Sequence, residues 1–147
     1  MGDGVEKTPE SLAALVFKDD LTGLYNRRFL FKWLKAEVKW DAKDGPPLSL
    51  LMLDLDDFKK INDTRGHLAG DDALRHFAKT FFIGLRPGDV GIRYAGDEFA
   101  ILCPNTPKAA AAEVGRAFIE RLARSPWPPD ASRPLLLKAS AGLATFP

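Results

Sequence analysis

Residues 48–54 read LSLLMLD, a strand-length apolar run that stops at a carboxylate. An almost unbroken run of this kind predicts a strand buried on both faces, near the middle of a sheet. Downstream, two short strands are expected at residues 90–94 and 99–103, because the four residues AGDE between them (95–98) have the length of a hairpin turn. The small and apolar residues of 135–146 predict a final strand.

Helices are expected between and before these strands. Apolar residues recur at helical spacing from Leu74 to Leu85, after a polar loop, and the pattern ends at the RPGD turn of residues 86–89. A second helix is expected to open after Thr106, a favourable N-cap, and to fill most of the segment before the final strand. A third helix, over residues 26–43, precedes the first strand.

The order of these elements predicts the fold class. From residue 48 onward the chain alternates as strand, helix, strand, strand, helix, strand, which is the ferredoxin-like βαββαβ arrangement. The predicted fold class is therefore α/β, or more closely an α+β sandwich in which helices flank a central, mainly antiparallel sheet. In this arrangement the first and third strands are antiparallel neighbours at the centre of the sheet.

Composition limits the partners and the location. The 147 residues carry 21 Lys+Arg and 20 Asp+Glu, a net charge of +1, so the chain lacks the charge excess used to bind duplex DNA or anionic lipid. No apolar run reaches the ~20 residues of a membrane span, and the N-terminus lacks the pattern of a secretory signal. The single cysteine cannot form an internal disulfide. We expect a cytoplasmic chain with no nucleic-acid partner and no direct membrane insertion.

Three carboxylates that are far apart in the sequence are expected to meet at one edge of the sheet. Asp54 ends the first strand, and the predicted strand order brings the hairpin residues Asp97 and Glu98 beside it. Lys59 and Arg93 are the only obvious cations nearby. Carboxylate oxygens suit Mg²⁺ or Mn²⁺, and two such ions in one site can activate a hydroxyl and neutralise a reacting phosphate. Taken singly, each residue is also consistent with a strand terminus or an ordinary hairpin turn.

Four segments, in this order, resemble the GGDEF domain of diguanylate cyclases. They are residues 19–28 (DDLTGLYNRR), residues 54–63 (DLDDFKKIND), the pairs Gly66-His67 and Gly70-Asp71, and residues 93–99 (RYAGDEF). The resemblance covers residues 19–147, which leaves residues 1–18 as a linker or the end of an upstream helix. It implies a palm-type core similar to those of nucleotidyl cyclases. It also implies the condensation of two GTP molecules into cyclic di-GMP, with release of two pyrophosphates.

The resemblance implies a role for each matching residue. The implied ligands of two Mg²⁺ or Mn²⁺ ions are Asp54, the backbone carbonyl of Leu55, Asp97 and Glu98. The implied catalytic residues are Asp97, at the position of the base for the ribose 3′-hydroxyl, Glu98 beside the metals, and Lys59, which offsets charge on the phosphates. The implied substrate contacts are Phe58, Asn62, His67, Asp71 and Gly96, of which Asn62 and Asp71 match the pair that reads the guanine edge.

Arg86 and Asp89 match the spacing of a product-inhibition site in many diguanylate cyclases. In that site the arginine binds phosphate and guanine, and the aspartate accepts hydrogen bonds from the guanine edge. The alternative is that Pro87 and Gly88 simply make a turn. A second arginine is expected to complete the site, but no motif fixes whether it is Arg116 or another.

Two departures from the family pattern bear on activity. Ala95 stands where the commonest residue is glycine, and its methyl group restricts the backbone of the turn. After residue 144 the family continues into a helix and a strand whose Lys and Arg grip the triphosphate, whereas this sequence stops at Pro147. We therefore expect the C-terminal helix and strand to be absent from this chain and its turnover to be weakened.

Three functional hypotheses follow. The first is an active cyclase that works as a homodimer, because a two-fold symmetric product needs two domains that face each other, each with one GTP. An upstream sensory or dimerisation domain would then control the encounter. The second is a catalytically weak or inactive GGDEF domain that binds cyclic di-GMP or GTP as a regulatory module. The third is a different nucleotidyl-transfer enzyme on the same palm-like sheet, including one that accepts ATP.

Overall fold

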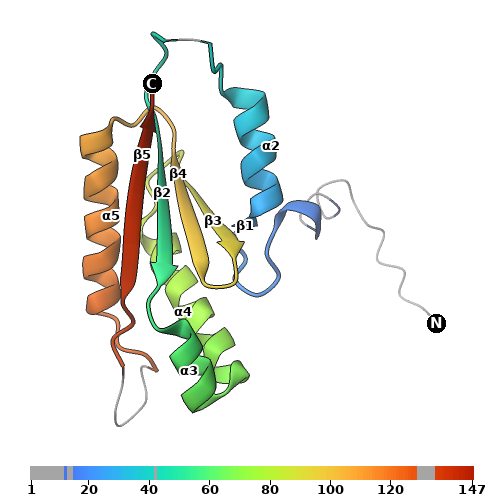
Figure 1. Ribbon diagram of the computed structural model, residues 1–147, viewed down its shortest axis with the longest axis vertical. Coiled ribbons are helices and arrows are strands. Elements are labelled where there is room, and N and C mark those ends of the chain that lie inside the picture. The colour runs from blue at the N-terminus through green and yellow to red at the C-terminus, as the bar shows by residue number, and fades with distance from the viewer. Residues whose placement is uncertain (1–11, 13–14, 42, 129–134) are drawn as a thin grey trace, which may run out of the picture.

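A five-stranded sheet with helices on both faces forms the domain (Figure 1). The computed structural model describes residues 12, 15–41, 43–128 and 135–147. The strands are β1 (Tyr25–Asn26), β2 (Leu48–Leu55), β3 (Val90–Ala95), β4 (Glu98–Cys103) and β5 (Ala139–Phe146). The helices are α2 (Arg27–Glu37), α3 (Phe58–Arg65), α4 (His67–Gly84) and α5 (Lys108–Ala123).

The order of the strands confirms the predicted topology. Across the sheet the strands follow the order β1-β3-β4-β2-β5, and β2 pairs antiparallel with both β4 and β5. The four strands from residue 48 onward therefore have the ferredoxin-like order, with the first and third strands adjacent at the centre. The two-residue strand β1 adds a parallel edge beside β3, which makes the sheet mixed.

The alternation of side chains along the central strands divides the core into two layers. The first layer packs the β2 residues Leu51, Leu53 and Leu55 against α4 and α5. The second layer lies on the opposite face, where Ile92, Ala100 and Leu102 pack against Leu30 and its neighbours on α2. Because successive strand residues point to opposite faces, β2 carries apolar side chains on both of its faces, as its sequence predicts.

Several boundaries differ from the sequence prediction. Helix α5 has Pro107 as its N-cap, because the hydroxyl of Thr106, the predicted cap, donates to the Pro104 carbonyl instead. Helix α2 ends at Glu37 rather than at residue 43, and Trp40 lies beyond it with its ring 5.1 Å from that of Phe146. The segment predicted as a polar loop is helical over α3 and the start of α4. Its helical pattern is weak because Ile61 is the single buried residue of α3. The last strand begins at Ala139, since Leu135 instead forms an isolated bridge with Trp127.

The N-terminal segment that we predicted to be a linker, residues 1–18, lies mostly outside the described residues. Within it, residues 12 and 15–17 are helical, and Lys18 bridges to Tyr25. None of the helices in the described ranges is both long enough and apolar enough to cross a membrane.

Candidate active site at the ends of the central strands

The strand register brings the predicted carboxylates together at one end of the sheet. Asp54, near the end of β2, lies directly opposite Glu98, the first residue of β4. Directly opposite residues share a face of the sheet, so both side chains lie on the same face, and both are exposed. Asp97 lies in the adjoining turn, where its backbone carbonyl accepts a hydrogen bond from the Leu55 N–H at 3.0 Å. The predicted convergence of these three residues is therefore confirmed.

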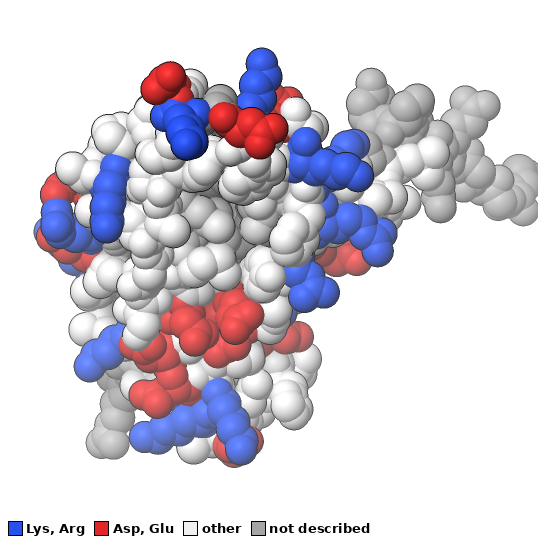
Figure 2. All heavy atoms as spheres, turned by 45° about the horizontal axis from the view of Figure 1, so that its top comes forward, with Lys and Arg blue, Asp and Glu red and all other residues white. Residues whose placement is uncertain are grey.

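A fourth carboxylate, Asp56, borders this cluster on the side of β5. Its backbone N–H donates to the Lys138 carbonyl at 2.8 Å, and its Oδ1 accepts from the Ser140 hydroxyl at 2.8 Å. Ser140 is the residue of β5 opposite Asp54. Figure 2 shows acidic side chains gathered on one face of the molecule. The end of β2 is thus flanked by acidic groups of β4 and of the loop that follows β2.

These negative charges are close enough to change the protonation of Asp54. Desolvation raises the pKa of Asp54 above 3.8, and the charge of Asp97, a hydrogen bond with Asp97, and the charges of Glu98 and Asp56 raise it further. In the described part of the chain none of these four carboxylates makes a salt bridge. The negative charge is therefore concentrated and uncompensated.

Arg93, one of the two cations expected to offset this charge, has other partners. Its guanidinium donates to both carboxylate oxygens of Asp19, at 3.1 and 3.3 Å, and to the Gly96 carbonyl at 3.0 Å. The arginine therefore ties the hairpin turn to the segment before β1. Asp19 and Arg93 both belong to segments that resemble the family, but they are 74 positions apart and no local spacing predicts their contact.

The uncompensated carboxylates fit a divalent cation. Magnesium commonly keeps several waters and takes one or two protein carboxylates, so a pair of acidic side chains such as Asp54 and Asp97 is a sufficient donor set. Their mutual repulsion, expressed in the raised pKa of Asp54, is what a cation would relieve. Across the described residues, however, no group of three or more His, Cys, Asp or Glu side chains is already arranged around a metal position.

The residues implied for guanine binding lie on the two helices that follow β2. Asn62 belongs to α3, whereas His67 is the first residue of α4 and Asp71 lies one turn later. His67 is exposed, and Asn62 and Asp71 are half-buried. The Oδ1 atom of Asn62 is buried and has no hydrogen-bond partner. A buried acceptor without a donor is unusual in a folded protein.

Gly70 makes room for this amide. A Cβ atom added at Gly70 would lie 1.8 Å from Asn62 Oδ1 and 3.4 Å from the Cζ atom of Phe58. The half-buried Phe58 begins α3, so helices α3 and α4 meet at a glycine. Lys59, the next residue, is exposed in the first turn of α3.

Comparison with known proteins identifies the family. A sequence profile described as "Diguanylate cyclase, GGDEF domain" matches residues 16–147. The chain belongs to the GGDEF domain family. It is 36% identical to the Escherichia coli diguanylate cyclase DosC over 128 residues, which are 87% of this chain and 28% of DosC. It is 42% identical to the Pseudomonas aeruginosa diguanylate cyclase DgcP over 132 residues, 87% of this chain and 19% of DgcP.

The fold of this GGDEF domain also matches solved structures. The coiled coil and GGDEF domain of DgcB from Caulobacter crescentus, in complex with c-di-GMP, superposes with a TM-score of 0.84 and 25% identity. The match covers 94% of this chain and 73% of the DgcB chain. The chain spans less than a third of the length of DosC or DgcP.

The predicted product-inhibition residues of this GGDEF domain bind each other. Arg86 donates to both carboxylate oxygens of Asp89, at 2.8 and 3.0 Å, and to the Thr106 hydroxyl at 2.9 Å. The Asp89 side chain is 2% exposed, whereas that of Arg86 is 42% exposed. Behind this pair, burial raises the pKa of the Cys103 thiol to about 12. Arg116 pairs with Glu113 on α5.

Proposed function

We propose that this GGDEF domain is a diguanylate cyclase, which joins two GTP molecules into cyclic di-GMP and releases two pyrophosphates. The observation that carries the proposal is the alignment of Asp54 with Glu98, next to Asp97, with no cation paired to any of them in the described residues. Such a cluster suits a reaction between polyphosphates, because the metal ions that accompany GTP would satisfy it.

In the proposed reaction each protein group has a separate task. The 3′-oxygen of one GTP attacks the α-phosphorus of the other, and the bond from that phosphorus to the departing pyrophosphate breaks. Asp97 accepts the proton of the 3′-hydroxyl. Two Mg²⁺ or Mn²⁺ ions, held by Asp54, the Leu55 carbonyl, Asp97 and Glu98, would supply charge neutralisation at the phosphates. Lys59 offsets the charge that develops on the leaving group.

Guanine selection is assigned to the α3 and α4 residues. Asp71 accepts hydrogen bonds from the N1–H and the exocyclic amine of guanine, which adenine does not present together. Asn62 is assigned to the same base. Its Oδ1 has no hydrogen-bond partner but is buried against Gly70, so the amide must turn outward before it can meet a guanine N–H. Phe58, His67 and Gly96 contact the remaining parts of the nucleotide.

The product requires two such domains. Each domain holds one GTP, and a two-fold symmetric ring closes only when two domains face each other. The working unit is therefore a homodimer, and a sensory or dimerisation segment upstream of residue 19 would control its formation. Ala95 adds a methyl group to an exposed turn, where it leaves Gly96, Asp97 and Glu98 in place.

Feedback by the product is assigned to the turn of Arg86 and Asp89. The exposed part of the Arg86 guanidinium is able to bind a phosphate or a guanine of cyclic di-GMP. The Asp89 carboxylate accepts hydrogen bonds from Arg86 and is nearly buried. Product binding at Asp89 therefore requires this ion pair to open. We expect inhibition only at product concentrations high enough for the free energy of binding to offset the loss of the ion pair.

The activity is tested by incubating the concentrated chain with GTP and Mg²⁺ and identifying the products by chromatography and mass. We expect cyclic di-GMP from the parent and none from Asp97→Ala. Saturable binding of cyclic di-GMP that Arg86→Ala abolishes, without any product from GTP, would instead establish the regulatory binding module. Equal turnover of ATP would establish a different nucleotidyl-transfer enzyme.

A further inference from the structure

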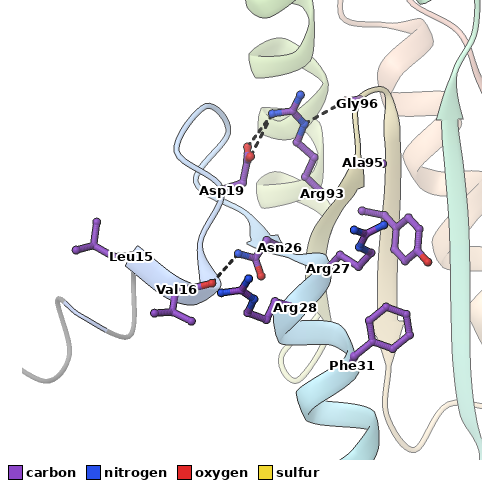
Figure 3. Close-up of a pocket in the computed structure, with 11 residues that line it drawn as sticks. Leu15, Val16, Asp19, Asn26, Arg27, Arg28, Phe31, Arg93, Ala95 and Gly96 are labelled. Carbon is purple, nitrogen blue, oxygen red and sulfur yellow. Dashed lines mark hydrogen bonds and ion pairs between the residues drawn. The ribbon is translucent and has the colours of Figure 1, made fainter.

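A cavity lies between the end of β3 and the start of α2, beside the hairpin that carries Asp97 (Figure 3). It measures about 680 Å³ and is bordered by the first turns of α2, by the end of β3 and by Leu15 and Val16. Small-molecule sites usually enclose about 300–1,000 Å³. None of the roles proposed above involves the α2 residues that form this cavity.

The charge of the cavity is strongly positive. Arg27, Arg28 and Arg93 line it, and among the lining residues that the structure describes Asp19 is the single carboxylate. Asp19 is already saturated, because it accepts hydrogen bonds from Arg93 and from the backbone and hydroxyl of Thr22. Within the described residues Arg27 and Arg28 take part in no salt bridge, although both are exposed.

The position of these two arginines on α2 makes the excess charge more unfavourable. They are the first two residues of the helix, whose first turn contains no acidic side chain. Cations at this end oppose the helix dipole and destabilise the helix where they are not compensated. An anion bound between the two guanidinium groups would remove both the mutual repulsion and the conflict with the dipole.

The walls of the cavity add aromatic rings to the arginines. Phe31 and Tyr94 have ring centroids 6.3 Å apart, and the Arg27 guanidinium lies 5.6 Å from the centroid of Tyr94. Figure 3 shows Arg27 and Phe31 reaching from α2 toward β3, with Arg28 on the side of Val16. Arginines bind phosphate oxygens in a bidentate manner, and exposed aromatic rings accept a stacked base.

We propose that this cavity binds a phosphate-bearing nucleotide, with Arg27 and Arg28 on the phosphates and with Phe31 and Tyr94 against the base. The site adjoins the proposed cyclase pocket and shares Gly96 with it. Ala95 lies opposite Glu98, and Glu98 lies opposite Asp54, so two strand spacings separate the cavity from Asp54, about 10 Å. A bound nucleotide would contact Ala95 and Gly96, and thus the turn that carries Asp97.

The test is calorimetric titration of the full 147-residue chain with GTP in the absence of magnesium. The chain carries Asp54→Asn and Asn62→Ala, which disable the proposed cyclase pocket. We expect saturable binding that weakens at least tenfold when Arg27→Gln and Arg28→Gln are added. Lys35→Gln is the matched control, because Lys35 is an exposed cation of the same helix that does not line the cavity. This control should change the affinity by less than twofold.

Further probes test each half of the proposal. Pyrophosphate should bind more weakly than GTP, and guanosine should not bind measurably. Equal affinity of GTP for the arginine variant and its parent would overturn the proposal, and so would equal affinity for pyrophosphate and GTP. The proposal would also be overturned if the arginine substitutions changed only the monomer–dimer equilibrium measured by sedimentation. The cavity would then bind an acidic segment of a second copy of the chain. A failure of the chain to make cyclic di-GMP would not affect this titration, so the two proposals fail independently.

Discussion

Substitution of Gly70 by alanine tests whether the position of the Asn62 amide controls GTP binding. The added methyl carbon would lie 1.8 Å from Asn62 Oδ1 and 2.9 Å from its Cγ, whereas real Cβ contacts are essentially never shorter than 3.0 Å. The amide must therefore move by more than about 1 Å. A displacement of this size takes the amide out of hydrogen-bonding geometry with a base.

The expected magnitudes separate an effect on binding from an effect on folding. Overpacking lowers the unfolding free energy by about 1–3 kcal/mol, but alanine is preferred to glycine in a helix by about 1 kcal/mol, so we expect a net loss between zero and about 2 kcal/mol. The loss of one or two hydrogen bonds to guanine raises the KM for GTP about tenfold, with kcat largely retained. Urea denaturation and steady-state turnover measure the two quantities.

A double-mutant cycle decides whether the effect acts through Asn62. In an Asn62→Ala background the methyl group at Gly70 meets no amide, so we expect Gly70→Ala to change the KM by less than twofold there. If Gly70→Ala raises the KM equally in both backgrounds, or leaves it unchanged in both, the reasoning from the Gly70–Asn62 contact is refuted.

Three further substitutions address the carboxylates, the hairpin anchor and base selection. Asp54→Asn should abolish turnover yet raise the unfolding free energy of the metal-free chain by about 0.5–1 kcal/mol. Because the pKa of Asp54 is raised above 3.8 in the folded chain, the parent loses stability as the pH rises from 3.8 through the folded-state pKa. The advantage of the variant in urea denaturation should therefore be larger at about pH 7 than at about pH 3.5, and a smaller advantage at pH 7 would contradict the reasoning. Arg93→Gln removes the contacts to Asp19 and Gly96 and should lower the unfolding free energy by about 1–2 kcal/mol. It should also lower kcat by a larger factor than it changes the KM for GTP, and an unchanged kcat would show that the contact is dispensable for turnover. Asp71→Ser should reduce the preference for GTP over ATP about 10–100-fold in competition assays, and intact selectivity would remove Asp71 from the guanine site.

The fold was predictable from the sequence because its decisive signals are local. The apolar run of β2 and the hairpin-length spacing before β4 each depend on neighbouring residues, and their order selects one strand arrangement. Helix α3 was not predictable from periodicity, since a helix with one buried residue, Ile61, has no apolar stripe.

The candidate site was predictable only in part. The convergence of Asp54 with Glu98 follows from topology, so strand order was enough to predict it. The pairing of Arg93 with Asp19 and the buried acceptor of Asn62 depend on side-chain conformations, which no spacing in the sequence specifies. The sequence therefore predicts where the backbone places the acidic residues of the site. It does not predict the side-chain contacts that adjust their chemistry.

The pairing between β2 and β4 has a consequence for how activity varies among sequences. A slip of one residue would turn Glu98 to the opposite face. It would also move Phe99 and Ile101 out of the layer under α4 and α5 and into the smaller layer that Ala100 and Leu102 fill, so the packing of the buried side chains holds the carboxylates in alignment. Selection for a tightly packed interior is thereby selection for the position of the acidic groups. Substitutions at chemically inert core positions should then alter turnover without touching any reacting group, and a survey confined to polar residues would overlook the positions that keep the site aligned.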